Sequence, residues 1–242
     1  ILAKRIVLQL DFIEITGDDG QLDLQWLDEQ LARARLLSLT HISNTMGTVN
    51  PVAEICARAR AAGVVTVVDA AQSAGHAPVD VQAIDCDFLA FSGHKTCGPT
   101  GIGVLYGRRE LLEAMPPYQG GGEMILKVEY RDSTFNVAPH KFEAGTPHIA
   151  GAIGLGAAVD FIRSVGFEAI AGHERRLLDY ATDRLSAVPG LRLIGTASEK
   201  AGILSFVLDG VHAHDIGTIV DTEGVAIRTY QHCTQPVMAR FN

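Results

Sequence analysis

The chain has 242 residues, of which 47% are hydrophobic and 20% are charged, so it can bury the core of one large domain or a domain and a half. Its 20 basic and 28 acidic residues give a net charge of −8, which argues against a nucleic-acid partner because phosphate binding requires clustered Lys and Arg. A small-molecule substrate fits this acidic charge better. No apolar run reaches the length of a membrane span, so we expect no membrane partner.

The four cysteines form no C-x-x-C pair and have no zinc-ligand spacing, so neither a metal site nor a disulfide framework is expected. A reducing compartment, and hence a cytoplasmic location, follows as the expectation. The chain begins at Ile1 without Met and without the apolar region of a signal peptide, and we expect it to be a piece of a longer protein. A plastid or another organelle stays open, because a transit peptide would precede Ile1.

In the first 110 residues, short apolar runs alternate with helical patterns. This alternation is typical of β-α-β units and a mostly parallel sheet. The predicted strands lie near residues 10–15, 36–41, 64–69, 88–91 and 103–106, and amphipathic helices are predicted over 23–34 and 51–62.

After residue 110 the pattern becomes irregular over 116–139, which is typical of a functional or mobile loop beside an active site. Two helices, the first rich in Gly and Ala and so suited to close backbone packing, are predicted over 149–164 and 167–187. Strands over 191–194, 203–208 and 225–228 follow, with a helix over 214–222. We therefore expect an α/β fold: a mostly parallel sheet flanked by helices in residues 1–147, then connecting helices and an incomplete α+β small domain in residues 148–242.

Polar side chains follow three of the predicted strands, at 43–44, 69–72 and 92–95. Ligands of open α/β sheets bind at the carboxyl ends of the strands, so these residues are expected to face one crevice. Lys95 lies 26 residues after Asp69. An amine and a carboxylate at neighbouring strand ends suit an enzyme that holds an aldehyde cofactor, of which pyridoxal 5'-phosphate is the first to test.

Each of these residues alone also has an ordinary structural explanation. Asp69 would cap a strand, and Lys95 would be a solvated lysine, because lysine is rarely buried. A lone cysteine such as Cys233 is more often a small buried hydrophobe than a nucleophile. The combination of Lys95 and Asp69 with Gln72 and Ser92 is what favours a cofactor site.

Several short segments around the lysine form a specific pattern. They are SNT at 43–45, DAAQ at 69–72, PVDVQA at 78–83, FSGHK at 91–95, CGPTGIG at 97–103, GGGEMI at 120–125 and FEAGTP at 142–147. Together they resemble the signature of the cysteine desulfurases, which are fold-type-I pyridoxal phosphate enzymes of the class V aminotransferase superfamily. The segment IRTYQHCTQP at 227–236 is similar to the catalytic-cysteine segment of that family's group II, SufS-like branch.

The resemblance implies a cofactor site for pyridoxal 5'-phosphate. Lys95 would bond covalently to the cofactor aldehyde and later move the substrate proton, while Asp69 would pair with the ring nitrogen. The other implied contacts are Ala71 with the ring face, Gln72 with the ring hydroxylate, Ser92 and His94 with the phosphate, and Thr146 with the phosphate of the neighbouring subunit's site in a homodimer.

The resemblance also implies a substrate site for L-cysteine. Asn44 and Arg228 would orient the substrate, because an amide and a guanidinium both donate hydrogen bonds to a carboxylate. Cys233 would attack the substrate sulfur, leaving L-alanine and a persulfide, with His232 or Arg228 favouring the reactive thiolate. A small SufE- or SufU-like protein would then accept the sulfur for iron–sulfur cluster assembly.

Some parts of the family pattern differ or fall outside the chain. The family's ring-stacking histidine and its phosphate loop would precede Ile1, and its substrate-carboxylate arginine would follow Asn242. Tyr230 and Gln231 stand where relatives have Gly and His. Three alternatives therefore stay open: a selenocysteine lyase, an aminotransferase or epimerase of the same fold that would not need Cys233, and a catalytically silent homologue that acts as a dimerisation or binding module.

Overall fold

The computed structural model describes residues 8–17, 19–229 and 233–241, which cluster into two compact units. The first, which we call the lysine unit, comprises Leu36–Leu39 and Val52–Phe167. The second, the cysteine unit, takes the described residues of Ile1–Arg35, Thr40–Pro51 and Glu168–Asn242. Each unit is made of segments that alternate along the chain. The predicted division into residues 1–147 and 148–242 is a single boundary in the sequence, and it stays a prediction.

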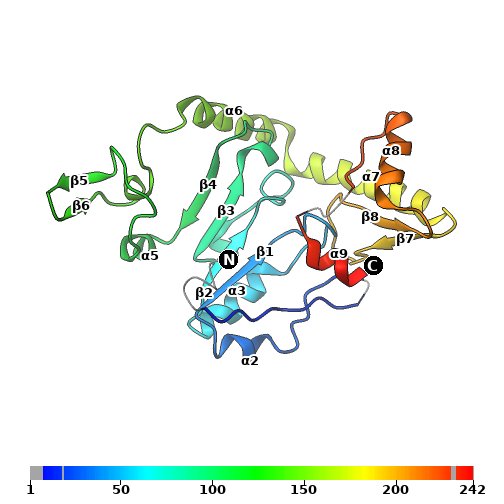
Figure 1. Ribbon diagram of the computed structural model, residues 1–242, viewed down its shortest axis with the longest axis horizontal. Coiled ribbons are helices and arrows are strands. Elements are labelled where there is room, and N and C mark those ends of the chain that lie inside the picture. The colour runs from blue at the N-terminus through cyan, green and yellow to red at the C-terminus, as the bar shows by residue number, and fades with distance from the viewer. Residues whose placement is uncertain (1–7, 18, 230–232, 242) are drawn as a thin grey trace. The chain divides into compact units, whose positions relative to one another are not determined.

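The lysine unit is built on a four-stranded sheet in the order β1-β2-β3-β4 (Figure 1). Strands β2 and β3 run parallel, with Asp69 opposite Ala90, while β4 is antiparallel to β3, with Gly103 opposite Ser92. The connection from β3 to β4 is too short for a crossover helix, so β4 turns back along β3. The strands are β1 (Leu36–Thr40), β2 (Val65–Asp69), β3 (Phe88–Ser92) and β4 (Gly103–Gly107).

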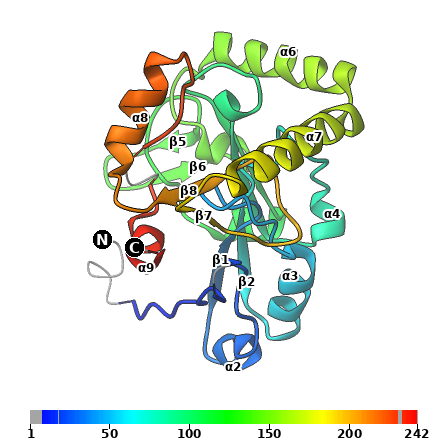
Figure 2. The ribbon, with the colours of Figure 1, turned by 90° about the vertical axis from the view of Figure 1, so that its right-hand side faces the viewer.

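Helices flank this sheet because their apolar residues recur at helical spacing. In α3 the buried residues Val52, Ile55, Cys56 and Ala59 follow the i, i+3, i+4, i+7 pattern of one helix face. Figure 2 shows α3 and α4 on the same side of the strands. The predicted α/β fold with helices flanking parallel strands is thus confirmed, with β4 as an antiparallel strand at its edge. The helices are α3 (Val52–Ala61), α4 (Val81–Ile84), α5 (Arg109–Ala114) and α6 (Ile149–Val165).

A tightly bonded turn between β3 and β4 carries the predicted lysine. The 3-10 helix η1 (Gly93–Lys95) follows β3 directly. The carbonyl oxygen of Gly93 accepts hydrogen bonds from the Thr96 hydroxyl, the Thr96 N–H and the Gly98 N–H, each at 2.9 Å. This convergence of donors fixes the backbone on both sides of Lys95.

Two other segments pack closely against this lysine turn, each through a glycine. A Cβ at Gly154 of α6 would lie 3.1 Å from Cγ of Pro99, so the Gly- and Ala-rich composition of α6 does allow close packing there. A Cβ at Gly75, in the turn after β2, would lie only 2.7 Å from the carbonyl oxygen of Lys95. The turns that follow β2 and β3 are therefore in direct contact.

The opposite end of the same strands holds a buried carboxylate. Asp87, just before β3, accepts hydrogen bonds from the N–H and the hydroxyl of Thr66 at 2.8 and 3.1 Å. The guanidinium Nε of Arg108 lies 3.0 Å from the same carboxylate. Because a buried charge is costly without partners, this set stabilises the sheet at the amino ends of β2 and β3.

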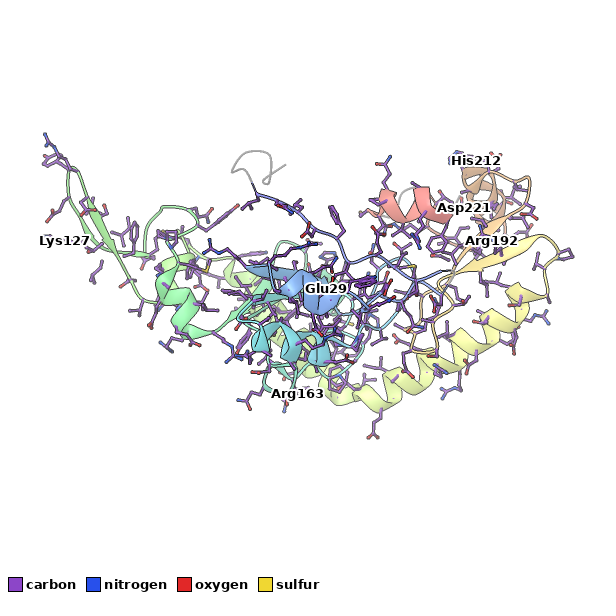
Figure 3. The ribbon with its side chains drawn as sticks, turned by 90° about the horizontal axis from the view of Figure 1, so that it is seen from below. Glu29, Lys127, Arg163, Arg192, His212 and Asp221 are labelled. Atoms are coloured by element: carbon purple, nitrogen blue, oxygen red, sulfur yellow. The ribbon has the colours of Figure 1, made fainter. Side chains whose placement is uncertain are left out.

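The cysteine unit contains a small antiparallel sheet and a core of Met46, Ile194 and Phe241. Arg192 of β7, labelled in Figure 3, donates to the carbonyl of Phe241 at 2.7 Å and so fastens the end of α9 to that sheet. The elements are α2 (Leu27–Leu31), α7 (Phe167–Ser186), β7 (Leu191–Ile194), β8 (Ser205–Leu208), α8 (Ala213–Thr222) and α9 (Gln235–Phe241).

Three sequence-based expectations about elements were wrong. The expected strand over 10–15 forms one isolated bridge, between Ile15 and Leu22, and Leu10 and Phe12 are 60% and 71% exposed. Residues 225–228 form no strand. Apart from that bridge, the apolar residues of both segments find no strand partner within the described chain. The irregular segment 116–139 contains a hairpin, made of β5 (Ile125–Val128) and β6 (Ser133–Phe135) before η2 (His140–Phe142).

No single helix in the described chain combines the length and the apolar composition that crossing a membrane requires. Helices α6 and α7 meet that test only when they are taken together across a 74° bend.

Lys200 holds a turn of the cysteine unit in place. Its Nζ donates to the carbonyl of Met46 and, at 2.7 Å, to the carbonyl of Gly195. Burial disfavours the charged amine and lowers the pKa of Lys200 from 10.5 to about 8. A neutral amine still offers two N–H donors, which match these two carbonyls.

We expect Gly75→Ala to destabilise the protein by about 1–3 kcal/mol, because the new methyl group has no room beside the carbonyl oxygen of Lys95. Urea unfolding measures the change. Gly120→Ala is the matched control, since a Cβ at Gly120 meets nothing within 4 Å. Equal stability of the two variants would contradict the close approach of the two turns.

Lys200 should make the stability of the protein depend on pH. Below about pH 8 the amine is protonated in both folded and unfolded states, and its full burial cost is present. Between about pH 8 and 10.5 the folded state has released this proton and the unfolded state has not, so the free energy of unfolding rises with pH. Lys200→Met should lack this rise in urea unfolding, whereas Lys127→Met, at an exposed lysine, should keep it.

Candidate active site

Most of the predicted cofactor residues lie at the carboxyl ends of β2 and β3. These strands are neighbours and run parallel, so the side chains that follow them emerge at one edge of the sheet. The structure brings together Asp69, Ala71, Gln72, Ser92, His94 and Lys95, which we call the lysine group. The third predicted segment, which contains Asn44, belongs to the cysteine unit.

Asp69 is the last residue of β2 and is exposed. Its Oδ1 accepts a hydrogen bond from the N–H of Ala71 at 2.8 Å, which fixes the carboxylate against its own turn. Within the described chain the other oxygen, Oδ2, has no protein partner. The hydrogen bond to Oδ1 thus orients the carboxylate, and Oδ2 is available to accept a hydrogen bond from a ligand.

Ser92 and His94 form a hydrogen-bonded pair next to Lys95. The Ser92 Oγ lies 2.7 Å from Nδ1 of His94, which leaves Nε2 of the imidazole for another partner. Lys95 is exposed, and its amine bonds to no group in the part of the chain that the structure describes. A hydroxyl, an imidazole and an ammonium group on one short turn are the donor types that bind phosphate.

Thr146 lies in the exposed segment that precedes α6. The N–H of the preceding Gly145 donates to the carbonyl of Gly122 at 2.9 Å, so this segment is tied to the glycine-rich loop at 120–122. The predicted contact of Thr146 is with a neighbouring subunit and stays a prediction.

Asn44 and Arg228, the predicted substrate-orienting residues, line the same cavity of about 410 Å³ within the cysteine unit. The other polar side chains of this cavity are Thr45, Ser205 and Thr229, and most of its remaining lining is apolar. An amide and a guanidinium that share one cavity can bind one carboxylate together.

Cys233 is exposed and lies beside Arg228. The guanidinium Nη2 of Arg228 lies 3.6 Å from the Cys233 Sγ and donates a hydrogen bond to it. Cys233 also has a φ angle of 61°, in the left-handed region that residues other than glycine rarely adopt. His232, the other predicted neighbour of the thiol, lies outside the described residues, as do Tyr230 and Gln231.

The remaining cysteines divide into two kinds. Cys56 and Cys86 are buried, and burial raises the pKa of Cys56 to about 11 and that of Cys86 in the same direction. Both are therefore thiols at neutral pH and poor nucleophiles. Cys97 is exposed, two residues after Lys95. No group of three or more His, Cys, Asp or Glu side chains among the described residues is arranged to hold a metal ion.

Sequence reasoning did not single out the residues that support these groups. Gly75 and Thr96 fix the lysine turn, and Thr45 hydrogen-bonds the residue that follows Cys233. The SNT segment at 43–45 contains Thr45, but nothing in the sequence marks the supporting role of these residues, because each acts through contacts with other parts of the chain.

Comparison with known proteins agrees with this geometry. The chain is 50% identical to a probable cysteine desulfurase of Streptomyces coelicolor and to a cysteine desulfurase of Dickeya dadantii. Both matches cover 100% of this chain and 58% of the relative, so the chain spans well under two thirds of the length of these relatives.

Solved structures of similar proteins match the whole fold. The apo structure of a cysteine desulfurase from Thermococcus onnurineus has a TM-score of 0.94 at 40% identity, over 99% of this chain and 60% of that one. The Escherichia coli cysteine desulfurase CsdA, in an S-sulfonic acid form, has a TM-score of 0.93 at 40% identity, over 99% of this chain and 59% of that one. The model of the aminotransferase class-V family matches residues 2–242. This chain belongs to the aminotransferase class-V family.

Proposed function

We propose that this chain is part of a pyridoxal 5'-phosphate-dependent cysteine desulfurase, which converts L-cysteine to L-alanine and passes the sulfur to Cys233. The observation that carries the proposal is the position of Asp69 and Lys95 at the ends of two neighbouring parallel strands, with polar atoms left for a ligand. The relatives at 50% identity, which are named cysteine desulfurases, support the same assignment.

The donor set of the lysine group fits pyridoxal 5'-phosphate. Such a cofactor needs an amine for its aldehyde, a carboxylate for its ring nitrogen and several donors for its phosphate. Lys95 provides the amine, Asp69 the carboxylate, and Ser92 with His94 the phosphate donors. When bound, the cofactor supplies a ring that withdraws electrons from the carbon next to the substrate nitrogen.

Each residue of the lysine group then has one task. Lys95 anchors the aldehyde and later carries a proton from or to the substrate. Asp69, oriented by the Ala71 N–H, would hold the ring nitrogen in its protonated form. Ala71 would contact the ring face, and the amide of Gln72 would donate to the ring hydroxylate.

The cysteine unit handles the substrate and its sulfur. Asn44 and Arg228 bind the carboxylate of L-cysteine from the walls of their shared cavity. The Cys233 thiolate forms a bond to the substrate sulfur while the bond from that sulfur to the substrate Cβ breaks, and the electron pair of the broken bond stays on the carbon. Protonation of that carbon completes L-alanine, and Cys233 keeps the sulfur as a persulfide.

The same proposal includes the partners of the whole protein. A homodimer would bring Thr146 to the cofactor phosphate of the neighbouring subunit. A SufE- or SufU-like carrier would take the sulfur from Cys233 toward iron–sulfur cluster assembly in the cytoplasm. The exposure of Cys233 supports such a transfer, because a persulfide must be reached by a second thiol.

Lys95 should bond covalently to pyridoxal 5'-phosphate. In the gene product that carries this chain, the added cofactor should give a visible absorbance band, and borohydride reduction should leave a pyridoxyl mass on the peptide that contains Lys95. Lys95→Ala should lose both signals, while Lys127→Ala, at an exposed lysine of β5, should keep them. A label that stays in the Lys95→Ala protein would refute the assignment of this amine.

Cys233→Ala should lower sulfide release from L-cysteine by at least about 100-fold, the lower end of what loss of a catalytic group costs. The pyridoxyl label on Lys95 should be unchanged, because Cys233 belongs to the other unit. Cys97→Ala, which removes the other exposed thiol, is the control and should retain activity. Wild-type protein that turns over L-selenocysteine but releases no sulfide from L-cysteine would identify a selenocysteine lyase instead.

A further inference from the structure

A hydrogen bond between two buried or half-buried hydroxyls joins the Asn44 turn to the Cys233 segment. The Oγ1 atoms of Thr45 and Thr234 lie 2.7 Å apart. Thr45 follows Asn44 in the chain, and Thr234 follows Cys233. We propose that Thr45 is a positioning residue for sulfur transfer: through Thr234 it holds the thiol of Cys233 at a fixed place relative to Asn44, and the inference rests on the function proposed above.

The turn that carries Thr45 is rigid enough to serve as an anchor. The Ser43 Oγ accepts from the N–H of Met46 at 3.1 Å, and the Ser43 N–H donates to the carbonyl of Thr48 at 2.9 Å. From the far side, Lys200 donates to the carbonyl of Met46. The turn is therefore closed internally and fastened to the segment after β7.

Thr45 itself has few alternatives to Thr234. Its side chain is 2% exposed, and its carbonyl accepts a hydrogen bond from the Ser205 Oγ at 2.6 Å. Bulk water does not reach a hydroxyl this deeply buried, so Thr45 would lose its hydrogen bond if it separated from Thr234. The Thr45 to Thr234 contact is thus a fixed part of the fold.

The fixed position of Thr234 constrains Cys233, its neighbour in the chain. Its carbonyl accepts from the N–H groups of Val237 and Met238 at 2.9 and 3.2 Å, which begins helix α9. Cys233 stands directly before this fixed residue, in a backbone conformation with positive φ. Freedom at Thr234 would let Cys233 leave both that conformation and its place beside Arg228. A displacement of this kind slows a transfer between two sulfur atoms without changing what binds the substrate.

The test is a double-mutant cycle in the complete gene product, with Thr45→Val, Thr234→Val and the double variant. Each single variant should lower kcat for sulfide release about 10-fold with little change in KM, and the double variant should be no worse than either, because both remove one shared contact. Thr45→Ser keeps the hydroxyl and should restore kcat. Thr48→Val removes another buried hydroxyl of the same turn, bonded to the Gly20 carbonyl, and should leave kcat unchanged. Additive losses, a loss in KM alone or an equal loss in Thr48→Val would overturn the proposal.

A second measurement separates this inference from the proposed function. The rate at which iodoacetamide alkylates Cys233, followed by peptide mass and compared with Cys97 in the same sample, needs no desulfurase activity. It should change in Thr45→Val and in Thr234→Val to the same extent as in the double variant, because Cys233 loses its place beside Arg228. If wild type releases no sulfide but the alkylation cycle behaves in this way, the proposed function fails and the positioning role of Thr45 stands. Unchanged alkylation in all three variants would refute the positioning role.

Discussion

Parallel pairing of β2 with β3 is the constraint on which the lysine group depends. It sets Asp69 opposite Ala90 and delivers both following turns to one edge of the sheet. A register shift of one residue would send every side chain of a strand to the other face. The antiparallel return of β4 then closes the turn around Lys95, and the contact at Gly75 presses the two turns together. Strand pairing and this contact together bring an amine and a carboxylate that are 26 residues apart in the chain to one edge of the sheet.

In the cysteine unit, a different kind of interaction holds the candidate site residues in place. Its sheet has two strands, which is too few to define a site through strand register. Side-chain hydrogen bonds replace that register: Lys200 and Ser205 hold the Asn44 turn, and Thr45 holds Thr234. Loss of one hydroxyl would therefore disturb the site in the cysteine unit, whereas one added Cβ at Gly75 would disturb the lysine group.

The sequence predicted well wherever the signal is local. Strand β2, which ends at Asp69, and strand β3, which precedes the turn of Lys95, were expected within one residue of their observed bounds, because each is a short apolar run that ends in polar residues. Two helices over 149–164 and 167–187 were rightly expected, and Gly166 between α6 and α7 has the positive φ that ends a helix. The strand expected over 10–15 failed because an apolar run becomes a strand only when another strand pairs with it.

The chemical groups of both sites can be read in the chain: the lysine and the carboxylate by type and spacing, and Cys233 by the resemblance of its segment to that of a known family. Their arrangement depends on contacts between segments that the order of residues does not specify. The antiparallel direction of β4 follows from the length of the turn before it. Whether a side chain fits at Gly75 depends on a carbonyl oxygen 20 residues later in the chain. The hydrogen bond between Thr45 and Thr234 joins residues that are 189 positions apart. Folding creates such contacts because burial brings distant polar groups together, and each must then find a partner or lose its hydrogen bond.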